Sequence, residues 1–367
     1  MPLTVGIIGL PNVGKSTLYN ALTQADALTA NYPFTTIEPN VGNVIIPDER
    51  LTHLSALLKP EKVTPTAIEF SDIAGLVKGA HKGEGLGNQF LAHIRSVDAI
   101  LHVVRCFDDD QVTHVDGNID ALRDIEVIEI ELMLADLEII EKRIPKIEKK
   151  AILNVDLQLT KEFELLKFLA DGLKSSIPIR KHTLTDFELE TIKPYGFLTL
   201  KPIIYVCNIG ESDLHDTISH PEVSRIIEHG RNNGIKVFTI CADLESLMGT
   251  LDEEERHLYL ETLDLHETGV SEMLKAVYDL LDLETFFTSE NNKLRAWTFK
   301  KGYTAKQCAG IIHSDFERGF IRAEVIKVDE LIKIGNLGEA KNLGKIRSEG
   351  KSYLVQDGDV IVFRFNV

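Results

Sequence analysis

The sequence predicts an α/β protein in which a mainly parallel sheet carries an inserted antiparallel helical hairpin and a small C-terminal module follows. Three observations predict this arrangement. An apolar run, a glycine-rich turn and a helical pattern follow one another at the amino end. Two amphipathic stripes with coiled-coil spacing lie within about 125–195. Alternating strand patterns recur after residue 282, so we expect domains at 1–282 and 283–367.

The composition is that of an ordinary globular protein. The chain has 367 residues, of which 44% are hydrophobic and 26% charged. No apolar run approaches the ~18 residues of a membrane span, and the first residues read as a strand instead of a signal peptide. We therefore expect a cytoplasmic protein with no membrane partner. The four cysteines are far apart, which favours neither a zinc site nor a disulfide framework.

The charge is strongly acidic but unevenly placed. A net charge of −17 argues against indiscriminate binding to nucleic acid, and we expect no DNA partner. Residues 283–367, by contrast, contain 14 Lys and Arg against 11 Asp and Glu. This small surplus is compatible with an RNA-facing C-terminal module, and equally with ordinary solvated lysines.

The glycine-rich turn is GLPNVGKST, Gly9 to Thr17, and it matches the phosphate-loop pattern G-x-x-x-x-G-K-S. Its glycines allow successive backbone N–H groups to point inward at the positive end of a helix. Lys15 is expected to reach the β- and γ-phosphates, Ser16 to offer its hydroxyl to Mg²⁺, and Thr17 to contact the α-phosphate side. The predicted fold class is therefore a P-loop nucleoside triphosphatase of the Ras-like type.

Two loops have the composition of nucleotide switches. The first, NYPFTTIEPN, contains Thr35 and Thr36, of which we favour Thr36 as a Mg²⁺ ligand; an ordinary solvated loop is the alternative. The second begins at Asp72, which ends a predicted strand and can hold Mg²⁺ through its water shell. The backbone N–H of Gly75 can sense the γ-phosphate.

The position that usually orients the attacking water carries Leu76 instead of glutamine. Leucine cannot hydrogen-bond, so we expect slow intrinsic hydrolysis that a partner raises. His114, in the polar loop FDDDQVTHVDG, is a candidate for positioning the water near the γ-phosphate. The alternative is a surface histidine.

The predicted base-reading segment is CNIGES, after a strand at 202–207. GTPases carry N-K-x-D there, with the aspartate accepting from guanine. This chain keeps Asn208 but has Ile209 and Glu211 in place of lysine and aspartate. Backbone groups around Asn208 and Ile209 could recognise adenine, which presents the opposite edge, but a glutamate could still accept from guanine. The residues alone leave the base open.

The helical hairpin is predicted from two stripes, and Pro145 should kink the first helix or disturb its pairing. Such an arm can be a contact surface for a partner or a helical insertion packed on itself. The two interpretations are compatible. The stripes contain the following residues: Ile130, Met133, Leu137, Ile140, Ile144, Ile147 and Ala151, then Leu159, Phe163, Leu166, Ala170 and Leu173.

The C-terminal module reads as strands around one helix, which suggests a ubiquitin-like β-grasp fold. We expect helical character at 304–319, a strand from Phe320, a helix through Gly338 to Glu349 and a closing hairpin. Asp357, Gly358 and Asp359 are interpreted as turn residues and not as a metal site.

Taken together, these strings resemble the YchF, or Obg-like ATPase, family of the Obg group, over nearly the whole chain. The second-switch string DIAGLVKGAHKGEGLGNQFL is the most specific of them. The resemblance implies a TGS domain at the C-terminus, ATP preferred over GTP as substrate, Mg²⁺ dependence and binding to the ribosome or its large subunit. It implies Mg²⁺ at Ser16 and Thr36, and nucleotide contacts at Asn12, Val13, Gly14, Lys15, Ser16, Thr17, Asn208, Ile209 and Glu211.

Three functions remain distinguishable. The first is a slow ATPase whose nucleotide state orders two loops and so sets affinity for the ribosome. The second is an RNA- or ribosome-binding adaptor in which hydrolysis is incidental. The third is a GTPase of the Obg group.

Overall fold

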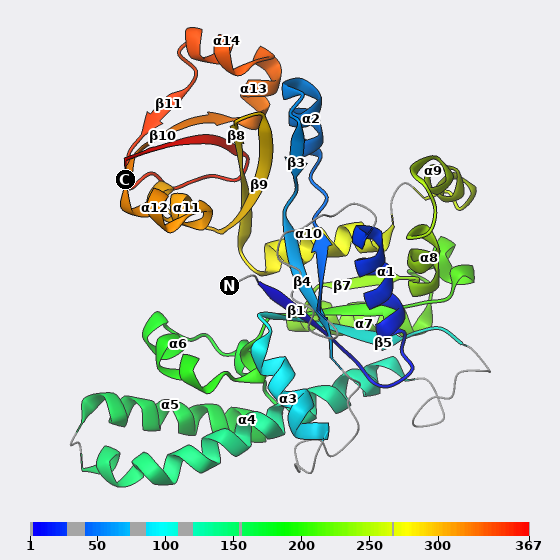
Figure 1. Cartoon of the computed structure of the whole chain (residues 1–367). Coiled ribbons are helices and arrows are strands. Elements are labelled where there is room, and N and C mark those ends of the chain that lie inside the picture. Colours follow the sequence, from blue (N-terminus) through cyan, green and yellow to red (C-terminus); the bar gives the residue numbers. More distant parts are fainter. Residues whose placement is uncertain are drawn as a thin grey trace. The chain divides into compact units, whose positions relative to one another are not determined.

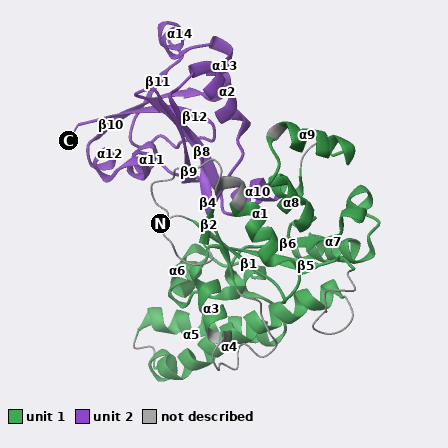
Figure 2. Ribbon diagram, turned by 45° about the vertical axis from the view of Figure 1, so that its right-hand side comes forward, with its two compact units in different colours: residues 1–43, 69–272 green, residues 44–68, 273–367 purple. Residues whose placement is uncertain are grey.

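The computed structural model describes residues 3–27, 41–73, 86–108, 120–153, 156–265 and 268–366. They form two compact units (Figure 2): residues 1–43 and 69–272 belong to the first, and residues 44–68 and 273–367 to the second. The segment 44–68, expected in an N-terminal domain at 1–282, is thus grouped with the C-terminal part of the chain. In the described ranges, no helix has the length and apolar content needed to cross a bilayer.

The first unit is built on a six-stranded sheet in the order β2-β4-β1-β5-β6-β7. β1 pairs in parallel with both β4 and β5, and the pairs β5–β6 and β6–β7 are also parallel. This confirms the predicted mainly parallel sheet. Strands β2 and β4 continue across the junctions with the second unit. The strands are β1 (Thr4–Ile8), β2 (Val41–Ile45), β4 (Ala67–Asp72), β5 (Ala99–Arg105), β6 (Ile203–Asn208) and β7 (Val237–Ile240).

The strand order reverses at β1. The strands of this sheet that follow β1 in the chain, β2 and β4, lie on one side of it, and β5, β6 and β7 lie on the other. In open α/β sheets, ligands bind at such a switch point, beyond the carboxyl ends of the strands. α1 starts at Lys15, within the glycine-rich segment that follows β1, and it packs against α8 (Figure 1). The helices of this part are α1 (Lys15–Ala27), α3 (Leu86–Ser96), α7 (Pro221–Asn233), α8 (Ala242–Met248), α9 (Glu253–Thr262) and α10 (Gly269–Leu280), which crosses into the second unit.

The predicted helical hairpin consists of α4 (Ala121–Ile152) and α5 (Leu157–Lys174), which pack along one another (Figure 1). Most of the two predicted stripes form its core, together with Ile179, Ile192 and Phe197. Ile130 is an exception, because it is 47% exposed. The helix continues through Pro145 without a break in its assignment.

The hairpin is tied to the turn that follows it through a buried carboxylate. Asp136 accepts hydrogen bonds from the backbone N–H groups of Leu198 and Thr199, both 2.8 Å, and from the Thr199 hydroxyl at 2.7 Å. These three bonds satisfy a charge that burial would otherwise make costly. The connecting elements are η2 (Ile179–Lys181), α6 (Asp186–Ile192), η3 (Lys193–Tyr195) and η4 (Leu198–Leu200).

The second unit has its own six-stranded sheet, in the order β11-β10-β12-β8-β9-β3. β8 and β9 form an antiparallel hairpin, β10 pairs antiparallel with β11 and β12, and β12 lies parallel to β8. β3, from the segment 44–68, adds in parallel to β9 and completes the sheet. The strands are β3 (Lys62–Thr64), β8 (Leu283–Glu290), β9 (Lys293–Lys300), β10 (Phe320–Lys327), β11 (Arg347–Glu349) and β12 (Asp359–Phe365).

Two apolar clusters cover the two faces of this sheet, because neighbouring residues along each strand alternate between them. Phe286 belongs to the cluster under α11, and Phe287 to the cluster under α2 and α13. Leu51 and Leu54 of α2 are buried in the second cluster. The helices are α2 (Glu49–Leu58), α11 (Ala305–Ile312), α12 (Ser314–Arg318), α13 (Val328–Ile334) and α14 (Leu337–Asn342).

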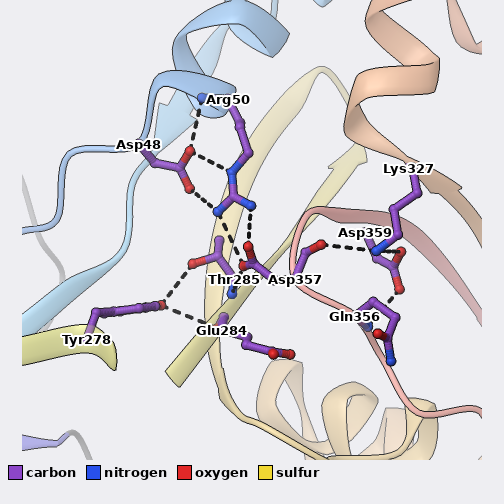
Figure 3. A network of polar contacts seen from close by, with 9 residues as sticks. All are labelled: Asp48, Arg50, Tyr278, Glu284, Thr285, Lys327, Gln356, Asp357 and Asp359. Atoms are coloured by element: carbon purple, nitrogen blue, oxygen red, sulfur yellow. Dashed lines mark hydrogen bonds and ion pairs between the residues drawn. The ribbon is translucent and has the colours of Figure 1, made fainter. Parts of the chain in front are cut away.

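A polar network also holds the segment 44–68 within the second unit (Figure 3). The Arg50 guanidinium donates to Asp48, and its Nη1 donates to Asp357 Oδ2 at 2.5 Å. Asp357 Oδ1 accepts from the backbone N–H of Thr285 at 2.9 Å. Asp357 and Gly358 form the predicted turn, in which Gly358 adopts a φ of +79°, and Asp359 begins β12.

Two expectations for the C-terminal module are wrong. The predicted helix through Gly338 to Glu349 ends at Asn342, since Gly344 turns the chain with a φ of +68° and residues 347–349 form β11. The closing segment contributes one strand, β12, which pairs with β10 and β8 instead of forming a hairpin. In both places, long-range strand pairing overrides the local pattern.

Candidate nucleotide site

The loop between β1 and α1 has a backbone shape that requires glycine at two positions. Gly9 has a φ of +155°, and a Cβ there would lie 2.4 Å from the carbonyl oxygen of Val103. Gly14 has a φ of +91°, and its Cβ would lie 2.2 Å from Asn208 Nδ2. Asn12 is also left-handed, with a φ of +63°, a conformation that asparagine tolerates well. The curled loop expected of a phosphate-binding turn is therefore present.

Lys15 is buried at the start of α1. Its Nζ donates to the carbonyl oxygen of Leu10 at 2.7 Å, across the loop. Burial lowers the pKa of Lys15 to about 8, and the negative charge of Asp72 partly opposes this shift. A polyphosphate in the loop would restore the ordinary preference for the ammonium form, because its negative charge would compensate for the water that burial removes.

Ser16 and Asp72, both predicted to serve Mg²⁺, lie together. Ser16 Oγ donates to Asp72 Oδ2 at 2.9 Å, which joins the start of α1 to the end of β4. The second carboxylate oxygen, Asp72 Oδ1, is buried without a hydrogen-bond partner among the described residues. Hydroxyl and carboxylate oxygens are the donors that Mg²⁺ prefers, so this pair fits a hydrated Mg²⁺ ion bound next to a phosphate.

Asn208 joins the phosphate loop to the segment after β7. Its Nδ2 donates to the carbonyl oxygen of Val13 at 3.0 Å, and its Oδ1 accepts from the backbone N–H of Ala242 at 3.0 Å. Its side chain is 4% exposed. Because both ends of the amide are engaged with backbone groups, Asn208 positions two loops relative to one another.

The two substituted base-reading residues have different environments. Ile209 is buried, and its backbone N–H donates to the carbonyl oxygen of Ile240 at 2.9 Å, so this group belongs to the sheet. Glu211 begins η5 (Glu211–Asp216) and is exposed. Its Oε1 accepts from the hydroxyl of Tyr259, on α9, at 3.1 Å.

Thr36, Gly75 and His114 lie outside the described residues, as does Leu76. The site that the structure does assemble contains Val13, Gly14, Lys15, Ser16, Asp72 and Asn208, with Thr17 half-buried on the first turn of α1.

Sequence reasoning missed two contributors. The Leu10 carbonyl oxygen acts through the backbone, which leaves no trace in residue type. Tyr259 lies far along the chain from Glu211, in a helix that the sequence analysis did not single out. The only available signal was the apolar spacing of the surrounding segment, which marks a packed helix and not its hydrogen-bond partner.

Two family models match the chain. The first, MMR_HSR1, described as 50S ribosome-binding GTPase, matches residues 4–136. The second, YchF-GTPase_C, described as a protein of unknown function, matches residues 283–366.

Full-length relatives are similar throughout. The ribosome-binding ATPase YchF of Bacillus subtilis is 53% identical over 367 residues, covering 100% of both chains, and that of Haemophilus influenzae is 48% identical with the same coverage. The solved structure of the Schizosaccharomyces pombe YchF GTPase matches with a TM-score of 0.90 and 34% identity, over 99% of this chain and 98% of that one. A GTP binding protein from Pyrococcus horikoshii shares the fold, with a TM-score of 0.63 and 20% identity over 99% of this chain and 100% of its own. The chain therefore belongs to the YchF family of P-loop nucleoside triphosphatases.

Proposed function

We propose that this protein is a Mg²⁺-dependent, ribosome-binding ATPase that acts as a nucleotide-controlled switch in translation or the stress response. The observation that carries the proposal is the assembled site: a buried lysine in a curled loop, bridged through Asn208 to a turn in which the guanine-reading lysine and aspartate are replaced. The names of relatives differ on the base, since those from bacteria are called ATPases and the yeast structure a GTPase.

Nucleotide binding is assigned to the loop from Asn12 to Thr17 and to the turn at 208–211. The loop's N–H groups cradle the phosphates, and Lys15 exchanges its bond with the Leu10 carbonyl for the β- and γ-phosphates. Since the Ile209 N–H is committed to Ile240, the adenine edge is read by other backbone groups of the turn. Glu211 adds a carboxylate acceptor, for which adenine has no donor at N1.

Metal binding is assigned to Ser16, Asp72 and Thr36. The bond between Ser16 and Asp72 and the unpartnered Asp72 Oδ1 support the first two, and the sequence pattern supports Thr36. When bound there, Mg²⁺ would neutralise charge on the phosphates during transfer to water. Ser16 would offer its hydroxyl oxygen to the metal, and Asp72 would hold it through its water shell.

Water positioning is assigned to the Gly75 N–H and His114. Leucine at position 76 offers no hydrogen bond to the attacking water, so turnover by the protein alone is slow. A partner that completes the water-positioning arrangement around the γ-phosphate would raise the rate.

The ribosome is the proposed partner, and more specifically its large subunit. Support comes from the names of the bacterial relatives, from the 50S description of the matched family model and from the basic surplus of residues 283–367. A ribosomal partner also implies a cytoplasmic location.

Single-turnover hydrolysis of labelled ATP, with and without purified ribosomes, tests this proposal. We expect acceleration by ribosomes, and sedimentation with them that depends on the bound nucleotide and falls with salt. Lys15→Ala serves as the control, since it should abolish triphosphate binding with the fold intact. Equal rates and nucleotide-independent sedimentation would favour an adaptor, and equal competition by GTP would favour a GTPase.

The ribosome contact is best tested in the full-length chain. A deletion of residues 283–367 would expose Leu51 and Leu54 of α2 and leave β3 without its partner strand β9. Loss of binding by such a deletion would therefore report misfolding as readily as loss of a contact.

A further inference from the structure

The turn that carries Glu211 is packed against a helix outside the recognised nucleotide motifs. Glu211 begins η5, and the hydroxyl of Tyr259 on α9 donates to Glu211 Oε1 at 3.1 Å. This bond raises the pKa of the Tyr259 hydroxyl, whose ordinary value of about 10 already keeps the phenol protonated near neutral pH. A residue 48 positions along the chain thus holds the carboxylate that replaces the guanine-reading aspartate.

Tyr259 is held in place by three independent features of α9. Asp252 and Glu255 form a capping box that fixes the start of the helix. Arg256 Nε donates to the carbonyl oxygen of Met248, at the end of α8, at 2.6 Å. The Tyr259 ring packs in an apolar cluster that joins η5, α8 and α9, and contains Leu214, Cys241, Leu244, Met248, Leu251, Tyr259, Leu260, Leu263 and Leu265.

Guanine and adenine make different demands on a carboxylate at this position. Guanine presents two donors, N1–H and the 2-amino group, which a free carboxylate accepts with its two oxygens. Adenine presents an acceptor at N1 and cannot donate there. A carboxylate that already accepts from a fixed phenol has one oxygen turned toward α9 and is poorly oriented for the two guanine donors.

Resting on the proposed ATPase function, we propose that Tyr259 is a specificity-determining residue, which disfavours guanine by holding Glu211 away from the paired-acceptor geometry. Tyr259 acts through Glu211 and is a positioning residue. Its removal frees the carboxylate for guanine and leaves the phosphate contacts unchanged. The affinity for GTP therefore rises relative to the affinity for ATP. A general disruption of the site would instead change the two affinities in parallel.

The test is Tyr259→Phe in the full-length protein, which removes the hydroxyl and keeps the ring in its cluster. Dissociation constants for non-hydrolysable analogues of ATP, GTP and ITP are measured by calorimetry. We expect the ratio of GTP to ATP affinity to rise about tenfold, the factor typical of one hydrogen bond to a charged group. ITP lacks the 2-amino group and needs one acceptor, so its gain should be smaller than that of GTP.

A matched control is Tyr195→Phe. Its hydroxyl, in η3, also donates to a glutamate, but that glutamate is Glu162 of α5 in the helical hairpin. This variant should leave all three affinities unchanged. Glu211→Asp is a second variant, because the shorter side chain draws back from Tyr259 and should shift the ratio in the same direction.

The outcomes separate this inference from the proposed function. If the unmodified protein prefers ATP and Tyr259→Phe keeps the same ratio, the role of Tyr259 is refuted and the ATPase proposal stands. If the unmodified protein binds GTP as well as ATP, both are refuted. A parallel loss for all three nucleotides in Tyr259→Phe would show a structural role and also overturn the inference.

Discussion

The buried ammonium of Lys15 should make triphosphate binding depend on pH in the mildly alkaline range. Its pKa in the free protein is lowered to about 8 by burial. Binding of a polyphosphate favours the charged form and so raises this pKa. In the free protein, the Lys15 ammonium therefore loses its proton as the pH rises through about 8. Nucleotide binding above that pH must be accompanied by proton uptake at Lys15.

The size of the effect follows from this pKa. If only the ammonium form binds, the apparent dissociation constant rises by a factor of about 1.1 at pH 7 and about 11 at pH 9, a loss of about tenfold or about 1.4 kcal/mol. A lysine with the ordinary pKa of about 10.4 would lose only about 4% over the same interval. Phosphate groups, with a second pKa of about 6, are already ionised throughout and contribute little.

Calorimetric titration with a non-hydrolysable ATP analogue at constant Mg²⁺ measures both quantities. At pH 8.5, two buffers of different ionisation enthalpy should reveal an uptake of about 0.8 proton per site. Lys15→Arg keeps its charge across this range, so any binding that it retains should not vary with pH. Constant affinity and no proton uptake in the unmodified protein would refute the assigned environment of Lys15.

Three further predictions concern other described residues. Ser16→Ala should raise the Mg²⁺ concentration needed for half-maximal triphosphate binding, whereas Ser16→Thr, which keeps a hydroxyl, should not; an unchanged requirement in the alanine variant would remove Ser16 from the metal site. Burial raises the pKa of Asp136 to about 6, so its folded pKa exceeds the unfolded value of about 3.9. Stability should therefore fall by up to about 3 kcal/mol as the pH rises through that window, and Asp136→Asn should lose this dependence in thermal unfolding. Asp357→Ala removes an acceptor of both Arg50 and the Thr285 N–H, so amide exchange at Thr285 should quicken about tenfold by mass spectrometry; unchanged protection would show that the bond contributes little.

The parts of the fold that sequence could predict are those encoded over short distances. The phosphate loop is a contiguous motif with a strand before it and a helix after it, and the structure places it where the pattern indicates. The capping box of Thr185 and Glu188 at the start of α6 is also encoded within four consecutive residues. Asn208 was recognised as part of the motif, but its bonds to Val13 and Ala242 require knowledge of which loops meet.

The apolar stripe of the first hairpin helix, α4, shows that periodicity alone does not predict which residues are buried along the whole helix. The spacing places Ile130 and Met133 on one face, yet Ile130 is exposed. Near its start, α4 contacts α7 and β5 and buries a different face, with Ile128 and Leu132 inward. Spacing predicts that a face is buried, and only the tertiary partners decide where along the helix the buried face changes.

The segment 44–68 most clearly has packing and pairing partners that its local sequence does not encode. Leu51 and Leu54 show helical spacing, and β3 pairs with β9, more than two hundred residues further along the chain. The segment's ends are joined by a hydrogen bond from the Ile46 N–H to the Thr66 carbonyl oxygen at 3.0 Å. Its helix and strand are built into the core and sheet of the second unit.

The segment 44–68 also lies between two parts of the proposed metal site in the sequence. In the sequence, it begins shortly after Thr36 and ends in β4, the strand that carries Asp72. The two segments proposed to meet Mg²⁺ therefore flank a piece of chain whose apolar residues belong to the core of the other unit. If nucleotide binding displaces either segment, the displacement would reach chain that is covalently continuous with that core.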